Sequence, residues 1–196
     1  MTYPFFAYIA RMRYIGRWGL MRNTEPENIQ EHSHMVAVLA HALAVIRRDR
    51  FGGTVDPGRV TAAALYHDAS EILTGDLPTP IKYHNAEIMS AYHAVEDLAV
   101  QKLLGMLPPE LRETYADVLA EDKDGDIYPL VKAADKLSAY IKCIEERKAG
   151  NNEFLSAEAQ TRAALEASPL PEVQYFLEHF IPAFERDLDE LGAIGQ

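Results

Sequence analysis

The sequence is poor in cysteine and in basic residues. Cys143 is the only cysteine among 196 residues, so the chain can form neither an intramolecular disulfide nor a thiolate metal cluster, and we expect it in the reducing cytoplasm. Lys and Arg number 19 against 30 Asp and Glu, which gives a formal net charge of −11. Nucleic-acid polymers and anionic membranes bind clustered positive charge, so we expect neither as a partner. A small anionic substrate is still possible if positive charge at its binding site locally outweighs the negative charge of the chain.

Long hydrophobic runs are also lacking. The longest apolar segment extends from Met35 to Ile46 with His41 inside it, whereas a membrane span needs about 18 residues or more. The N-terminus is apolar first and basic afterwards, which reverses the order of a secretory signal. We therefore expect no membrane span and no export, and we interpret residues 35–46 as part of a buried helix.

Apolar residues recur at helical spacing almost throughout, and alternating β-branched runs are missing. The sequence therefore predicts an all-α fold, and because no long linker interrupts it, residues 1–196 are expected to form one domain. Helices are predicted at about 5–15, 29–48, 57–67, 85–106, 109–120, 127–148, 153–167 and 171–191. Pro182 should kink or divide the last of them. Residues 74–80 contain one Gly and two Pro, which predicts a loop or a break.

The acidic segment 121–126 begins like a calcium-binding loop but does not continue as one. Asp122, Asp124 and Asp126 alternate as such a loop begins, but Gly125 falls at the fourth position instead of the sixth. Ala133 stands at the twelfth position and cannot supply a carboxylate. We therefore predict a solvated loop.

An adjacent His67-Asp68 pair at a predicted helix end carries most of the chemical information. A helix terminus can splay two neighbouring side chains toward one divalent ion. His32 and Asp135, on two other predicted helices, would complete a set of two imidazoles and two carboxylates and leave positions for water and substrate. Such ligands suit Mn²⁺, Co²⁺, Fe²⁺ or Zn²⁺ better than Ca²⁺.

This order of residues resembles the HD-domain phosphohydrolase superfamily, whose helical core uses the four matching residues as ligands of a divalent metal. Further segments are similar to the bacterial 5'-deoxynucleotidases of that superfamily, and the similarity covers nearly the whole chain. They are residues 17–23 (RWGLMRN), 31–33 (EHS), 66–71 (YHDASE), 74–83 (TGDLPTPIKY) and 149–154 (AGNNEF).

The resemblance implies a homodimer that uses one divalent ion, such as Co, Mn or Zn, to remove the 5'-phosphate from deoxyribonucleoside monophosphates. It implies that the metal ligands are His32, His67, Asp68 and Asp135. Arg17 would orient the phosphate, and Trp18 would pack against the sugar where a 2'-hydroxyl would sit. The substrate loop would comprise Asp76, Leu77, Pro78 and Thr79. We expect the dimer interface at the C-terminal helices.

Two acids are candidates for proton transfer. If the helix continues past Asp68, Glu71 shares a face with His67 and Asp68, so it would position or deprotonate the attacking water. Asp76 is the candidate acid for the departing 5'-oxygen. Rejection of one hydroxyl by the shape of Trp18 is worth a factor of about 10².

Two other functional classes stay open. A related phosphohydrolase could act on a triphosphate, a cyclic dinucleotide or an alarmone, although one guanidinium beside one aromatic ring provides little for a polyphosphate. A helical scaffold could also keep this fold, but none of the four ligands is missing.

The remaining histidines and the cysteine are expected to be structural. His34 is interpreted as structural or exposed, and His41 as buried and hydrogen-bonded. No role is assigned to His84, His93 or His179, and Cys143 is expected to be an inert core or interface thiol.

Overall fold

The computed structural model describes residues 2–82, 84–120 and 125–192, and at residues 79 and 80 it describes the backbone alone. Within these ranges the chain folds into helices joined by turns and loops, without a strand. A single isolated bridge pairs Gly16 with Asn28. The prediction of an all-α fold is confirmed.

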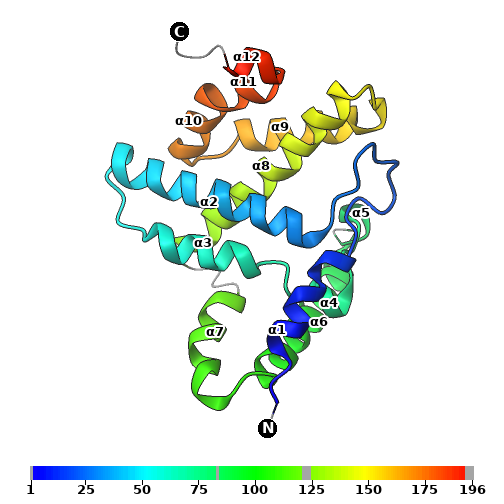
Figure 1. The fold of residues 1–196 in the computed structure, drawn as a ribbon, viewed down its shortest axis with the longest axis vertical. Helices are drawn as coiled ribbons and strands as arrows, with labels where there is room; N and C mark the ends of the chain where they lie inside the picture. Colours follow the sequence, from blue (N-terminus) through cyan, green and yellow to red (C-terminus); the bar gives the residue numbers. More distant parts are fainter. Residues whose placement is uncertain (1, 83, 121–124, 193–196) are drawn as a thin grey trace.

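Three helices form the centre of the molecule (Figure 1). They are α2 (Ile29–Phe51), α3 (Pro57–Tyr66) and α8 (Ile127–Lys148), and α2 packs against both of the others. The interpretation of residues 35–46 as part of a buried helix is confirmed for one face of α2, because Val36, Leu39, Ala40 and Leu43 are at most 3% exposed. This core contains Val36, Leu39, Ala40 and Leu43 of α2, Val60 and Ala64 of α3, and Leu137 and Ile141 of α8.

Both ends of α2 are set by local sequence. The Asn28 side chain accepts hydrogen bonds from the N–H groups of Gln30 and Glu31, and the Glu31 carboxylate accepts one from the Asn28 N–H. Gly52 ends the helix in the left-handed region with φ 71°, which glycine adopts without steric cost. This start places His32 in the first turns of α2, on the buried side.

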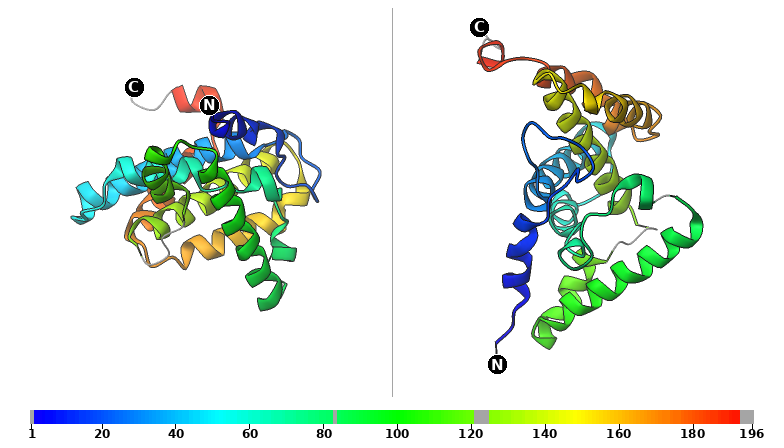
Figure 2. Two further views of the ribbon diagram at one scale, coloured as in Figure 1. Left: turned by 90° about the horizontal axis from the view of Figure 1, so that it is seen from below. Right: turned by 90° about the vertical axis from the view of Figure 1, so that its right-hand side faces the viewer.

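The C-terminal helices cover one end of α2 and α8 (Figures 1 and 2). This region begins with η3, which ends at Phe154. Pro182 stands in the first turn of α11, so the predicted division of the last helix is confirmed. The segments are η3 (Asn152–Phe154), α9 (Leu155–Glu166), α10 (Pro171–His179), α11 (Ile181–Phe184) and α12 (Leu188–Gly192).

The remaining segments lie on the opposite side, around a second apolar cluster built on Phe5, Leu103 and Leu107 (Figure 2). The predicted helix 5–15 is an α-helix followed by a 3₁₀ turn. The segments are α1 (Phe5–Ile9), η1 (Ala10–Tyr14), α4 (Glu71–Thr74), α5 (Thr79–Lys82), α6 (Ala86–Gly105), η2 (Pro109–Leu111) and α7 (Arg112–Leu119).

Several predictions about loops and surfaces need correction or fall outside the described ranges. The predicted loop 74–80 ends early, because α5 already begins at Thr79, where a proline in the first turn is tolerated. Most of the predicted acidic loop, residues 121–124, lies outside the described residues. His41 is exposed instead of buried: it stands nine residues after His32, which is half a turn away around α2.

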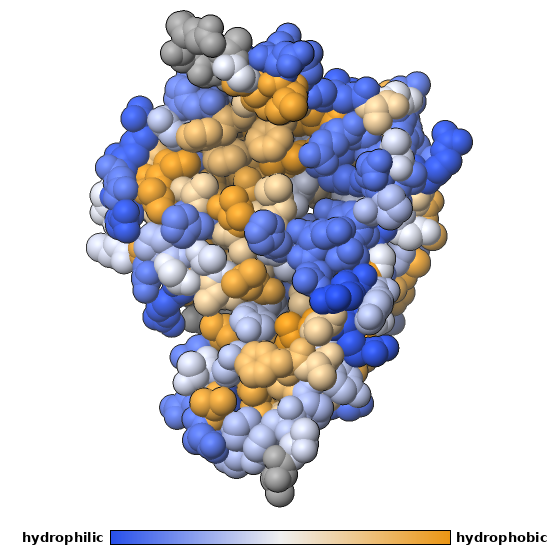
Figure 3. All heavy atoms as spheres, viewed as in Figure 1, coloured by the Kyte–Doolittle hydropathy of each residue, from blue (hydrophilic) through white to orange (hydrophobic). Residues whose placement is uncertain are grey.

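None of the described helices combines the length and the apolar content that crossing a membrane requires. On the face shown in Figure 3, apolar side chains gather near the C-terminal helices and near the N-terminus, with hydrophilic residues between and around them. His34 is exposed and Cys143 is buried, as predicted.

Candidate metal centre and substrate site

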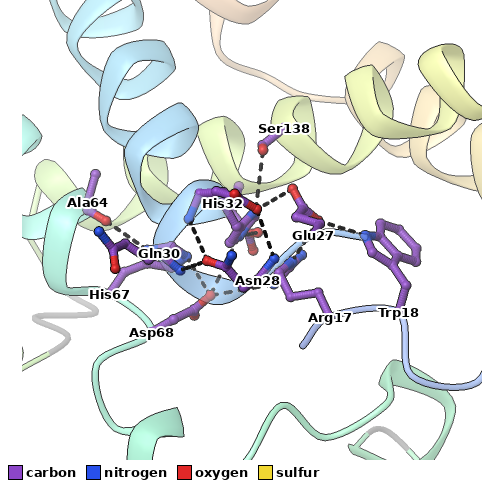
Figure 4. A network of polar contacts seen from close by, with 12 residues as sticks. Arg17, Trp18, Glu27, Asn28, Gln30, His32, Ala64, His67, Asp68 and Ser138 are labelled. Carbon is purple, nitrogen blue, oxygen red and sulfur yellow. Dashed lines mark hydrogen bonds and ion pairs between the residues drawn. The ribbon is translucent and has the colours of Figure 1, made fainter. Parts of the chain in front are cut away.

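His32 lies at the centre of a polar cluster between α2, α3 and α8 (Figure 4). Its side chain is fully buried. The ring Nδ1 is 3.2 Å from the Ser138 hydroxyl on α8, and Nε2 is 3.1 Å from Asp135 Oδ1 and 3.5 Å from Asp68 Oδ2. One ring nitrogen is thus oriented by a neutral hydroxyl while the other faces two carboxylates.

The end of α3 presents His67 and Asp68 to the same cluster. The α-helix ends at Tyr66, and the chain continues in tight turns in which Ala69 N–H donates to Tyr66 O and Glu71 N–H donates to Asp68 O. His67 Nδ1 is 2.8 Å from the carbonyl oxygen of Ala64. A carbonyl can only accept, so Nδ1 carries a proton and the neutral ring keeps its lone pair on Nε2.

The third element is α8, which contributes Asp135. One ligand atom each from His32, His67 and Asp135 lie within 4.8 Å of one another, and Asp68 Oδ2 is 3.2 Å from His67 Nε2. The four predicted ligands, His32, His67, Asp68 and Asp135, therefore meet in one place.

The chemistry of this donor set fits a divalent cation. Both imidazole Nε2 atoms are buried, and within the described part of the chain neither has a hydrogen-bond partner. Burial alone would raise the pKa of Asp68 and of Asp135, but the neighbouring imidazoles lower both pKa values well below the ordinary range, with Arg17 adding to the effect on Asp68. Two ionised carboxylates beside two imidazoles are ligands of the kind that transition metals prefer.

The fields of these carboxylates also act on His67. Burial alone would lower its pKa, but the charges of Asp68 and Asp135 outweigh burial and raise it. A cation at this place would therefore compete with a proton for His67 Nε2, and its binding would release that proton.

Arg17 and Trp18 lie beside the four candidate ligands, on the connector between η1 and α2. Arg17 Nη1 is 3.5 Å from Asp68 Oδ2, and Arg17 Nε donates to Glu27 Oε2 over 3.1 Å. Trp18 Nε1 donates to the same oxygen over 2.8 Å, and its ring centroid is 5.2 Å from that of Phe154. The structure thus brings the predicted phosphate and sugar residues to the edge of the cluster.

Glu71 and Asp76 lie on the other side of Asp68. Glu71 is 6% exposed, and its pKa is raised to about 9 by burial and by the negative charges of Asp68 and Asp76. Burial also raises the pKa of Asp76, with Arg17 opposing the shift. The helix ends before Asp68, so Glu71 does not share a continuous helical face with His67 and Asp68, but its carboxyl group still comes close enough to Asp68 to couple with it.

The substrate loop follows α4. Gly75 adopts φ 76° and ψ 160°, a region that side chains with a Cβ rarely enter, and its carbonyl oxygen is 3.5 Å from the Tyr92 hydroxyl on α6. Asp76, Leu77 and Pro78 are half-buried. The side chain of Thr79, also predicted to contact substrate, lies outside the described atoms.

Sequence reasoning missed residues that support this site. Glu27 joins Arg17 to Trp18, and Ser138 contacts His32. Neither residue belongs to a recognisable ligand pattern. The one available signal is spacing, because Ser138 stands three residues after Asp135 and so shares its face of α8.

Comparisons with known proteins agree on one family. A family model described as 5'-deoxynucleotidase YfbR-like matches residues 4–184. The 5'-deoxynucleotidase YfbR of Escherichia coli (strain K12 / DH10B) is 52% identical over 189 residues, which covers 96% of this chain and 95% of that protein. The protein of the same name from Shigella flexneri matches with the same identity and coverage.

Two solved structures share the fold. A HD-domain phosphohydrolase from Listeria innocua superposes with a TM-score of 0.81 and 25% identity, covering 92% of this chain and 87% of the other. The HD phosphohydrolase of cyanophage S-2L, described as bound to dA and one catalytic Zn²⁺ ion, superposes with a TM-score of 0.57 and 25% identity, covering 94% and 96% of the two chains.

Proposed function

Because the chain belongs to the 5'-deoxynucleotidase YfbR-like family, we propose that its own metal centre and connector hydrolyse deoxyribonucleoside 5'-monophosphates to deoxyribonucleosides and orthophosphate. It is a phosphoric monoester hydrolase of the HD type. The observation that carries the proposal is the meeting of two carboxylates beside Arg17 with two buried imidazole nitrogens that make no hydrogen bond.

The metal would be held by His32, His67, Asp68 and Asp135. When bound, a divalent ion lowers the pKa of a coordinated water and polarises a phosphoryl oxygen. Zn²⁺ is named for the cyanophage relative, and for this chain we propose one ion of Co, Mn, Zn or a similar metal. Ser138 supports the assignment, because its contact with His32 Nδ1 leaves Nε2 as the ligating atom.

Arg17 would bind the phosphate. Its Nε is held by Glu27, so the planar guanidinium is fixed, and its Nη1 lies 3.5 Å from a carboxylate oxygen of Asp68. A phosphate group beside Asp68 would meet two N–H donors from one plane, a geometry that a lysine cannot match. The strongly acidic chain thus supplies a fixed positive charge where an anionic ester needs it.

Glu71 and Asp76 would handle protons. Glu71 is buried next to Asp68 and would position the attacking water. It would deprotonate that water only after a bound cation had lowered its raised pKa. Asp76, whose pKa is raised by burial, would protonate the departing 5'-oxygen, because a raised pKa keeps a proton available for donation. Leu77, Pro78 and Thr79 would complete the substrate loop.

Trp18 would distinguish deoxyribose from ribose. Its indole packs against the Phe154 ring at a tilt of 58° and is held by Glu27, so it would form a fixed wall at the edge of the site. Exclusion of a 2'-hydroxyl by shape would make deoxyribonucleotides better substrates than ribonucleotides by a factor of about 10², without excluding ribonucleotides completely.

Three further assignments are part of the proposal. We expect a homodimer, one functional domain over residues 1–196, and a cytoplasmic location, for which the buried free thiol of Cys143 is the supporting feature. Sedimentation of the purified protein would test the dimer, since a monomer at working concentrations would contradict it.

The products test the reaction class. Chelated enzyme with one metal restored should release orthophosphate from dAMP, and it should release no pyrophosphate from dATP or guanosine tetraphosphate. Release of pyrophosphate from either polyphosphate would favour a phosphohydrolase that acts on triphosphates or alarmones. No product from any substrate would favour a helical scaffold without catalytic activity.

A further inference from the structure

Glu27 connects three parts of the candidate site that the proposed mechanism treats separately. One of its oxygens, Oε2, accepts hydrogen bonds from Arg17 Nε over 3.1 Å and from Trp18 Nε1 over 2.8 Å. The other, Oε1, lies 3.9 Å from Nδ1 of the metal-ligand candidate His32. Figure 4 shows this carboxylate between His32 and the two connector residues. A single side chain thus fixes the phosphate and sugar residues relative to the metal site.

The backbone holds Glu27 in place independently of its side chain. Arg17 N–H donates to the Glu27 carbonyl oxygen over 2.9 Å, and Ile29 N–H donates to the Ile15 carbonyl oxygen over 3.0 Å, around the bridge between Gly16 and Asn28. Asn28 in turn caps α2. Glu27 is therefore anchored to the helix that carries His32 and can act as a fixed support for residues 17 and 18.

Trp18 needs such a support. Its backbone has φ 58°, the one non-glycine residue with positive φ among those described, and a residue with a Cβ occupies this left-handed region only when its surroundings hold it there. The ring packs near Phe154, which restrains its faces, and Glu27 accepts from its indole N–H. Without that acceptor the ring keeps its apolar packing but loses the contact that fixes its rotation.

We propose that Glu27 is a specificity-determining positioning residue, which holds the indole of Trp18 and the guanidinium of Arg17 in register with His32 and thereby sets the preference for deoxyribose. The proposal rests on the proposed function, because it assigns the preference to Trp18. Selection against a single hydroxyl by shape is modest, so it depends on a wall that does not move. A mobile indole would admit the 2'-hydroxyl without any change in the metal ligands.

Two substitutions separate the roles of the carboxylate. Glu27→Met keeps the length of the side chain and removes both acceptors, so the ratio of kcat/KM for dAMP to kcat/KM for AMP should fall about tenfold. Glu27→Gln keeps an oxygen that can accept from Trp18 Nε1, so this ratio should stay near that of the wild type while kcat/KM for both substrates falls, because the charge beside Arg17 is lost. Glu25→Gln, an exposed residue of the same connector, is the matched control and should change neither quantity.

Fluorescence provides a readout that does not depend on activity, because Trp18 is the only tryptophan of the chain. Acrylamide should quench the fluorescence of Glu27→Met more strongly than that of the wild type, with Glu27→Gln close to the wild type. Far-UV circular dichroism confirms that each variant is folded. If Glu27→Met does not fold, Glu27→Ala also removes both acceptors while keeping the Trp18 ring, and it should lower the dAMP to AMP ratio similarly.

The outcomes are distinguishable. A wild type that releases no orthophosphate from dAMP with any metal overturns the proposed function itself. An active wild type with an unchanged ratio and unchanged quenching in folded Glu27→Met overturns only the role of Glu27. An equal fall in the dAMP to AMP ratio in Glu27→Met and Glu27→Gln would also contradict the role of Glu27, because the acceptor retained in Glu27→Gln should preserve the preference for deoxyribose.

Discussion

Glu146 on α8 is expected to stabilise both the fold and the connector that carries Arg17 and Trp18. It is 2% exposed, and its carboxylate accepts hydrogen bonds from Lys142 Nζ over 2.5 Å and from Asn151 Nδ2 over 2.8 Å. It also accepts from the backbone N–H groups of Thr24 and Glu25 over 2.8 and 3.3 Å. Two N–H groups of the connector thus end on one buried carboxylate.

Glu146→Ala would leave the buried ammonium group of Lys142 without its counter-charge, with only the Glu25 carbonyl oxygen as an acceptor, and it would leave two backbone N–H groups without theirs. Removal of one partner from a buried ion pair costs about 3–5 kcal/mol of unfolding free energy. For a chain of this length each kcal/mol lowers Tm by about 2–4 °C, so a fall of about 10 °C is expected. Replacing Glu146 and Lys142 together by Met should recover part of the loss, because it removes the unpaired charge but not the unpaired N–H groups.

Urea unfolding measures the change in free energy, with Glu145→Ala as the matched control. Glu145 is the exposed neighbour on the same helix, so its substitution should cost less than about 0.5 kcal/mol. A loss of unfolding free energy below about 1 kcal/mol in Glu146→Ala would contradict this prediction, because removing a buried carboxylate that accepts from four donors should cost more.

The pH dependence of this effect has a definite sign. Burial alone would raise the pKa of Glu146, but the hydrogen bonds from Lys142, Asn151 and Thr24 outweigh burial and lower the pKa well below its ordinary range. A lowered pKa in the folded state contributes stability above the unfolded value of about 4.3, and that contribution is lost as the pH falls toward the folded value. The difference in unfolding free energy between the wild type and Glu146→Ala should be constant near neutral pH and shrink below about pH 4.3.

Three predictions concern the site itself. Asp135→Asn should reduce the affinity for Zn²⁺ or Co²⁺ by more than about 10–100-fold, which is the cost of losing a residue that only supports a ligand. Metal titration measures this affinity, and an unchanged value would remove Asp135 from the ligand set. Glu71→Gln should lower kcat by about 10²–10⁴ while the metal content stays at the wild-type level, and an unaltered kcat would show that Glu71 does not act on the attacking water. Trp18→Ala should raise the activity on AMP relative to dAMP, and a constant ratio would mean that the sugar is recognised elsewhere.

The fold was largely predictable because its helices have strong local signals. The apolar helix over residues 35–46 and the division at Pro182 follow from residues close together in the sequence. The error at His41 shows the limit of this reasoning. An apolar run suggested burial on all sides, whereas only one face of α2 packs against its neighbours and His41 lies on another.

The four candidate metal ligands could be proposed from the sequence because their types and order are distinctive, and the structure brings all four together. Glu27 could not be found in this way, since an acid in a polar connector gains its role only when the bridge between Gly16 and Asn28 places it beside Trp18. The pair Lys142 and Glu146 has the i, i+4 spacing of an ordinary surface salt bridge. Only the docking of a distant segment on α8 buries it.

The central claim is that this metal centre dephosphorylates deoxyribonucleoside monophosphates in preference to ribonucleotides. The most direct test is orthophosphate release from dAMP and AMP under matched conditions, first after chelation and then with Mn²⁺, Co²⁺, Mg²⁺ or Zn²⁺ restored singly, with Asp135→Asn beside the wild type. We expect no release after chelation, release from dAMP well above that from AMP once a metal is restored, and little release from Asp135→Asn. Release that survives chelation, or equal release from wild type and Asp135→Asn, would contradict it.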